Sequence, residues 1–262
     1  MTYGQFLLFL LLPAIALSLL LFTLRVLSAT AADRTRMRNG LLLVAVLVVV
    51  AVAYTARWDR WLIEQQVWTY PPGSVIGTIG LVPIEEYLFM VGQTVLTACW
   101  ALTVTANTTR VPPIAYERRL RIRYLVGWLV LTAALACWAF ADQHALYAAA
   151  ILVWFGPLIA LQCAVGADVL RVARSPRMVG LSVTVLLWAL DSVAIQTGAW
   201  QISTRYTVGV QMLGLPLEEG MFFLVTNMLI VNSIVLVSHP AMRQRLAGWL
   251  PSSARRRPSV ES

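Results

Sequence analysis

Two pairs of adjacent glutamates stand at the start of long apolar runs in this chain. Glu85 and Glu86 lie in IGLVPIEEYLFM, and Glu218 and Glu219 lie in LGLPLEEGMFF. Two neighbouring carboxyl groups in different protonation states can serve as the acid and the base of one reaction. The repeated Pro-x-Glu-Glu pattern therefore indicates proton-transfer chemistry in apolar surroundings.

The same pattern has a structural interpretation as a helix start. Pro83 and Pro216 suit the first helical position, which places Glu85 and Glu218 near the third, where an acid complements the helix dipole. However, a cap needs only one acid, and charge inside a membrane span is costly. Burial favours the protonated carboxyl whereas a helix N-terminus favours the charged one, so a glutamate kept protonated by burial is a proton donor. We predict that all four glutamates are catalytic.

An aspartate and a tryptophan precede each glutamate pair at matching distances. Asp59 lies nine residues before Trp68, and Asp191 lies nine residues before Trp200. This identical spacing predicts a site role for both aspartates, which would tune or replenish the catalytic acids or hydrogen-bond the following loop. The tryptophans would either line the site or belong to the aromatic belt at the membrane surface.

Aromatic and polar residues around the glutamates complete the predicted substrate-binding set. Aromatic faces can stabilise a carbocation by cation–π attraction. The aromatic residues beside the acids are Tyr87, Phe89, Phe222 and Phe223. About two helical turns further on, where side chains would line the same cavity or bridge helices, lie Gln93, Thr94, Thr226 and Asn227. The three cysteines stand singly with no metal-ligand spacing, so no metal site is predicted.

The composition places these residues in a membrane. Apolar residues make up 59% of the 262 residues and charged residues only 12%, whereas soluble domains carry about 25% charged residues. Apolar runs near membrane-spanning length occupy residues 3–27, 40–55, 83–105, 124–140, 146–166, 178–195 and 216–238. The sequence therefore predicts an all-α integral membrane protein with seven transmembrane helices. The first run lacks a basic n-region and a cleavage site, so it is expected to remain as a span.

The arginines predict the orientation of the chain. All 20 basic residues are arginines, and 17 of them follow spans one, three and five or lie in the C-terminal tail, with Arg25 at the end of span one. The other side carries only Arg57, Arg60 and Arg205. The positive-inside rule then predicts an external N-terminus and a cytoplasmic C-terminus in the cell membrane. The net charge of +8 thus reflects topology, and no nucleic-acid partner is expected.

The matching motifs predict an internal repeat. Spans one to three correspond to spans five to seven, which gives a 3+1+3 parallel repeat with span four as the linker. The predicted units are residues 1–110 (first repeat), 111–144 (linker helix), 145–240 (second repeat) and 241–262 (a basic, disordered cytoplasmic tail). The glutamate pairs would face each other across a cavity between the repeats.

These residues resemble a known family. RWDRWLIEQQVWTYPPG with IGLVPIEEYLFMVGQTVLT, and LDSVAIQTGAWQI with GLPLEEGMFFLVTNMLIV, are similar to the two halves of the membrane-integral lycopene cyclases. In that family two short homologous polypeptides, or one fused chain, cyclise carotenoid ends, and this chain resembles the fused form over nearly its whole length. One departure is Gly220, which stands where the first copy has Tyr87.

The resemblance implies an enzyme that acts on lycopene or a related acyclic carotenoid. Protonation of the terminal double bond would give a tertiary cation, the next double bond would close a six-membered ring, and loss of a proton would end the reaction. Because nothing is oxidised overall, no cofactor or metal is expected. Expected partners are the substrate, membrane lipid and other carotenoid enzymes.

Other functional classes fit the sequence less well. A retinal protein needs a lysine, and this chain has none; an aspartate-rich prenyltransferase needs D-x-x-D or D-x-x-x-D, which is absent. No G-x-G-x-x-G motif indicates a flavin. The alternative is a proton-coupled small-molecule transporter of 3+1+3 architecture, in which buried acids couple protons to transport. A non-catalytic binding subunit is a third interpretation.

Overall fold

The computed structural model describes residues 1–105 and 116–249. The helices are α1 (Tyr3–Phe6), the π-helical η1 (Leu7–Leu11), α2 (Leu12–Leu27), α3 (Ala31–Glu64), α4 (Ile84–Thr105), α5 (Arg118–Ala141), η2 (Gln143–Ala145), α6 (Leu146–Val172), α7 (Arg174–Gln196), η3 (Thr204–Tyr206), α8 (Leu217–Ser238) and α9 (Pro240–Trp249). The strands are β1 (Trp68–Thr69), β2 (Thr78–Ile79), β3 (Val82–Pro83), β4 (Gln201–Ile202), β5 (Gln211–Met212) and β6 (Leu215–Pro216).

Seven helical segments of the described residues are long and apolar enough to cross a membrane, as predicted. They are Tyr3–Leu27, Met37–Glu64, Ile84–Val104, Arg118–Ala141, Gln143–Val172, Ser175–Gln196 and Leu217–Ser238. The predicted second span, residues 40–55, ends too early, because α3 continues to Glu64. Charged residues near its C-terminal end interrupt the apolar run but not the helix, so Asp59 lies inside α3.

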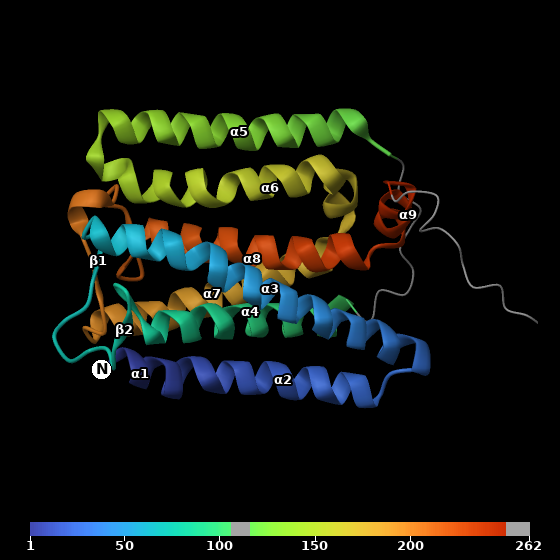
Figure 1. Ribbon diagram of the computed structural model, residues 1–262, viewed down its shortest axis with the longest axis horizontal. Coiled ribbons are helices and arrows are strands. Elements are labelled where there is room, and N and C mark those ends of the chain that lie inside the picture. Colours follow the sequence, from blue (N-terminus) through green and yellow to red (C-terminus); the bar gives the residue numbers. More distant parts are fainter. Residues whose placement is uncertain (106–115, 250–262) are drawn as a thin grey trace, which may run out of the picture.

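The spanning helices run side by side (Figure 1). Helix α5 packs on α6 at one edge of the bundle, and α2 packs on α4 at the other. Between them, α7 packs against both α4 and α8, and α3 packs mainly on α4. The N-terminus and the short strands lie at one end of the bundle and α9 lies at the opposite end (Figure 1).

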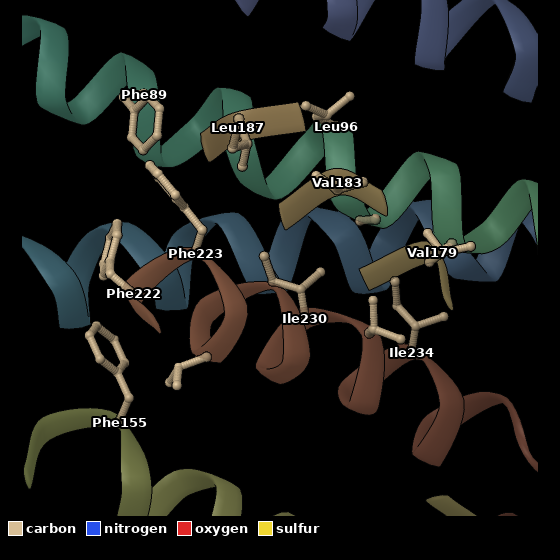
Figure 2. Close-up of a cluster of buried hydrophobic side chains, with 14 of the residues drawn as sticks. Phe89, Leu96, Phe155, Val179, Val183, Leu187, Phe222, Phe223, Ile230 and Ile234 are labelled. Atoms are coloured by element: carbon tan, nitrogen blue, oxygen red, sulfur yellow. The ribbon is translucent and has the colours of Figure 1, made fainter. Parts of the chain in front are cut away.

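The dry core of the bundle lies between α4, α7 and α8. Figure 2 shows Leu96 of α4, Val183 and Leu187 of α7, and Ile234 of α8 in this cluster, and all four side chains are buried. Close apolar packing between these helices fixes the relative positions of the helices that carry the candidate site residues.

A short β-hairpin leads into each helix that begins with a glutamate pair. Strand β2 pairs with β3 before α4, and β5 pairs with β6 before α8. The second hairpin turns through Leu213 and Gly214, which both have positive φ, as a two-residue hairpin turn of type I′ requires. Strand β1 pairs with β4 and so joins the loop after α3 to the loop after α7.

The C-terminal segment is ordered further than predicted. The prediction of a disordered tail from residue 241 is wrong for residues 241–249, which lie in α9, while residues 250–262 lie outside the described part of the chain. Both Nη atoms of Arg245 bind the buried Asp168 carboxylate of α6, and the Nη2–Oδ2 distance is 2.6 Å. This bidentate ion pair holds α9 against the bundle.

Candidate active site

The first glutamate of each pair supports the loop that precedes its helix. Glu85 Oε1 accepts a hydrogen bond from the backbone N–H of Ile76 at 2.7 Å, and Glu218 Oε1 accepts one from Val208 at 2.7 Å. Because Pro83 and Pro216 precede α4 and α8 instead of occupying their first positions, both glutamates are second residues of their helices. The helix-start interpretation thus accounts for one member of each pair.

The second glutamate of each pair points into the bundle and binds a tyrosine. The Tyr70 hydroxyl donates to Glu86 Oε1 at 2.6 Å, and the Tyr147 hydroxyl donates to Glu219 Oε1 at 2.6 Å. The Tyr3 side chain also hydrogen-bonds with Glu86. Sequence reasoning missed these tyrosines, although Tyr3 and Tyr147 begin spans one and five and an alignment of those two spans would have paired them.

Asp59 and Asp191 bring two more carboxyl groups to the glutamates. Their side chains are 1% and 3% exposed within α3 and α7. Asp59 Oδ1 and Asp191 Oδ2 have no hydrogen-bond partner among the described residues. Each aspartate interacts electrostatically with both Glu86 and Glu219, which also interact with each other. The four side chains form one buried group, named here the acid cluster.

Such a cluster is suited to holding and moving protons. Carboxylates packed closely in apolar surroundings repel one another, so they cannot all be ionised together. The pKa of the loop residue Tyr70 is raised well above its usual value, first by burial and then by the neighbouring Glu86 carboxyl. Its hydroxyl therefore remains a hydrogen-bond donor to Glu86 near neutral pH.

A cavity of about 290 Å³ reaches the acid cluster from inside the bundle. It lies between α3, α4, α6 and α8, and Asp59 and Glu86 are its two carboxyl residues. The predicted substrate-binding residues that line it are Asp59, Phe89, Gln93, Thr94, Phe222 and Thr226. Lining residues that sequence reasoning missed include Tyr54, Thr55, Phe155, Gln162 and Ser233. The cavity is thus an apolar and aromatic chamber with its carboxyl groups at one end.

The other predicted site residues lie outside the cavity lining. Trp68 packs edge-on against Trp58, with ring centroids 5.5 Å apart, and lies beside Glu219. Trp200 packs on Tyr3, at a centroid distance of 4.6 Å. These two tryptophans therefore cover the acid cluster from the strand end of the bundle and contact its tyrosine partners instead of the cavity.

Phe223, Tyr87, Asp191 and Glu219 also stand back from the cavity. Phe223 packs behind the lining, 5.4 Å from Phe222 and 6.2 Å from Phe89 between ring centroids. Tyr87 is partly exposed. Asp191 and Glu219 belong to the acid cluster but do not line the cavity. Of the two halves, the first therefore supplies the carboxyl groups that meet the cavity.

A polar bridge joins α4 to α8 and α7 below the acid cluster. Gln93 Nε2 donates to Thr226 Oγ1 at 2.8 Å and to Asn227 Oδ1 at 3.2 Å. Thr97 Oγ1 also donates to Asn227 Oδ1, at 2.8 Å, and Asn227 Nδ2 donates to Thr184 Oγ1 at 3.1 Å. Both predicted roles occur here, since Gln93 and Thr226 line the cavity while Asn227 only bridges helices.

The described residues contain no group of three or more His, Cys, Asp or Glu side chains arranged to hold a metal ion. Two of the buried carboxyl groups, those of Asp59 and Glu86, line a mainly apolar cavity. Seven helices that are long and apolar enough to cross a membrane, together with this site, are compatible with a multi-pass membrane protein.

Comparison with known proteins identifies the family. The lycopene cyclase family model matches residues 6–104 and 144–237. The chain belongs to the lycopene cyclase family. No solved structure matches it.

The chain is similar both to a lycopene beta-cyclase and to bifunctional proteins that are named for two activities. The chain is 36% identical to a lycopene beta-cyclase of Halobacterium salinarum, over 77% of this chain and 84% of that protein. It is 30% identical to a bifunctional lycopene cyclase/phytoene synthase of Aspergillus oryzae, and 34% identical to one of Leptosphaeria maculans. These matches cover 75% and 72% of this chain but only 34% of each bifunctional protein.

Proposed function

We propose that this protein is a lycopene cyclase that converts the acyclic end of a lycopene-type carotenoid to a six-membered ring. Membership of the lycopene cyclase family and the likeness to a lycopene beta-cyclase support this function. The observation that carries the mechanism is the meeting of the Glu86 and Asp59 carboxyl groups with an apolar, aromatic chamber. Only a ligand without charge suits such a chamber.

The reaction begins with proton transfer from Glu86. The π electrons of the terminal double bond take the proton from the protonated Glu86 carboxyl, which forms a C–H bond and leaves a tertiary cation on the adjacent carbon. Tyr70 donates its hydrogen bond to Glu86 Oε1 and so stabilises the carboxylate that remains. Glu219 belongs to the same acid cluster, and its carboxyl group interacts electrostatically with that of Glu86.

Ring closure follows inside the aromatic part of the chamber. The electrons of the next double bond form the new C–C bond to the cationic carbon, and the positive charge moves to a carbon of the ring. Phe89, Phe155 and Phe222 line this region, and their ring faces stabilise a cation by cation–π attraction. These three side chains carry no group that could act as a nucleophile toward the cation.

Loss of a proton ends the reaction. A carboxylate of the acid cluster accepts the proton from a carbon beside the cation, and those C–H electrons become the ring double bond. Asp59 lines the cavity from α3 and is the partner of Glu86 in this step. One proton enters and one leaves, so the substrate is neither oxidised nor reduced. Proton exchange with the solvent after product release returns Glu86 and Asp59 to their starting protonation states.

We also propose that the chain is a 3+1+3 parallel repeat with its N-terminus outside and its C-terminus in the cytoplasm. Matched contacts support the repeat, because the hydrogen bonds of Glu85 to Ile76 and of Glu218 to Val208 have the same length. The backbone bonds from Ile84 to Gly77 and from Leu217 to Val210 match as well, at 2.9 Å each. The arginine distribution supports the orientation.

Pigment analysis tests the cyclase function. Expression in cells that accumulate lycopene should yield cyclic carotenoids, whereas the transporter alternative predicts unchanged lycopene. Variants Glu86→Gln and Val49→Trp provide an inactive comparison and a matched control at an exposed position of α3 outside the cavity. Lycopene that stays acyclic despite normal accumulation of the unmodified protein would contradict the proposal.

A further inference from the structure

We infer that the carotenoid enters the cavity sideways from the lipid, through an opening between α3 and α6 bounded by Val50 and Leu161. This inference rests on the proposed function for the identity of the ligand, but the opening itself follows from the structure. A ligand that dissolves only in the hydrocarbon core of a membrane has no need to cross an aqueous surface on its way to such a site.

The exposure of the lining residues locates the opening. Val50 of α3 and Leu161 of α6 line the cavity, and yet their side chains are 52% and 59% exposed. Deeper lining residues such as Phe155 and Thr94 are buried. A side chain that belongs both to the lining and to the outer surface marks a place where the two meet. Because both residues lie in membrane-spanning helices, that surface faces lipid.

The contacts between α3 and α6 show where the gap is closed. The Tyr54 hydroxyl donates to the carbonyl of Trp154 at 2.6 Å, and Trp58 Nε1 donates to the carbonyl of Ala150 at 3.3 Å. Both bonds lie between the opening and the outer ends of the two helices. They hold α3 against α6 beside the acid cluster. Val50 lies one turn before Tyr54 in α3, on the side away from the acid cluster, and the opening begins there.

The opposite side and the strand end of the cavity are closed. On the opposite side, α7 packs directly on α4 and α8 through buried side chains that include Val183 and Leu187 (Figure 2). At the strand end, Trp58 and Trp68 pack against Phe222, with centroid distances of 5.3 and 6.3 Å. The gap between α3 and α6 is therefore the route that side chains leave open.

The distance from the opening to the acid cluster restricts the shape of a ligand that can react. Val50 lies nine residues from Asp59, which corresponds to about 14 Å along the helix axis. A ligand that enters at Val50 must extend a narrow apolar chain over that distance before its end reaches the acids. A linear polyene end meets this requirement, while the rest of the molecule stays in the opening or in the lipid. A bulky or polar group close to the reacting end does not fit.

A thiol-labelling experiment on the full-length protein in lipid vesicles tests the opening. The reporter is Leu229→Cys, a cavity-lining position on α8, combined with Cys137→Ser to remove the exposed native thiol; Cys99 and Cys163 are buried. The probe is pyrenyl maleimide, which partitions into lipid. We expect Leu161→Trp or Val50→Trp to slow labelling of the reporter by about tenfold or more, and cyclisation with it.

Matched variants control for indirect effects. Val49→Trp, exposed on the same helix but outside the lining, should leave labelling and cyclisation unchanged. Leu161→Ala should widen the opening and speed labelling, which also covers the case in which the tryptophan variants fold poorly.

The outcomes separate the inference from the proposed function. Unchanged labelling in Leu161→Trp, Val50→Trp and Leu161→Ala would overturn the inference, as would faster labelling by a sulfonated, water-soluble maleimide than by the pyrenyl reagent. If the opening responds as expected but the unmodified protein forms no cyclic carotenoid, the inference stands and the proposed function fails.

Discussion

Replacing Glu85 or Glu86 with glutamine distinguishes the roles of the two members of the first glutamate pair. Glu86→Gln keeps the shape of the side chain and an oxygen that can accept the hydrogen bond from Tyr70. It removes only the dissociable proton. A positioned general acid contributes about 10²- to 10⁴-fold to a rate, so we expect a loss of that size, equivalent to about 3–5 kcal/mol in the activation barrier.

Glu85→Gln is the matched control at the neighbouring position. Glu85 Oε1 accepts a hydrogen bond from the backbone N–H of Ile76, and the amide oxygen of glutamine can still accept it. We expect the stability to fall by about 1 kcal/mol and the cyclisation rate to change little. The corresponding pair, Glu218→Gln and Glu219→Gln, should show a smaller contrast because Glu219 does not line the cavity.

The assay is the initial rate of ring formation by purified protein in lipid, normalised to the amount of folded protein. Thermal unfolding measured on the same samples separates stability from chemistry. Equal rates for Glu86→Gln and Glu85→Gln would refute the division of the pair into a catalytic and a loop-supporting member. A severe loss in Glu85→Gln with normal stability would reverse the assignment.

Three further predictions address the surroundings of the site. Tyr70→Phe should slow cyclisation by about tenfold, and the deficit should be constant near neutral pH, because the raised pKa of Tyr70 keeps its hydroxyl protonated there; a deficit that appears only at high pH would contradict this. Gly220→Ala should lower the free energy of unfolding by about 1–3 kcal/mol, since its Cβ would lie 2.7 Å from the Trp188 ring, whereas Gly127→Ala, with nothing within 4 Å, should not destabilise. A reporter fused after Ser262 should be cytoplasmic and one at the N-terminus external; both on one side would exclude the proposed topology.

The number of spanning helices could be predicted because a membrane leaves the backbone few choices. Only helices or closed barrels satisfy backbone hydrogen bonds in lipid, so each long apolar run indicates a helix. Helix ends are less predictable. Arg57, Asp59 and Arg60 end the apolar run of the second span, yet α3 continues through all three because Asp59 faces the bundle interior.

The division of each glutamate pair was available from helix geometry. Adjacent residues of an α-helix point about 100° apart, so Glu85 and Glu86 point in different directions. The sequence prediction that all four glutamates are catalytic did not use this constraint. The structure directs Glu86 to the cavity and gives Glu85 a loop contact instead.

The one-sided cavity could not be predicted from the repeat. Matching motifs imply matching surroundings, but α7 packs closely on α4 whereas its counterpart α3 has little contact with α8, the counterpart of α4. Trp188 also packs on Gly220 in the second repeat, where the first repeat has Tyr87. Residue spacing carries no information about such fits.

Cyclisation in D2O tests the central claim most directly. If an exchangeable carboxyl proton starts ring closure, each ring formed over many turnovers should carry about one deuterium at the protonated carbon, since a different C–H bond is broken in the final step. Mass spectrometry of the cyclic product measures this, and Glu86→Gln should form almost none of it. Rings formed without deuterium, or formed at the normal rate by Glu86→Gln, would contradict proton transfer from Glu86.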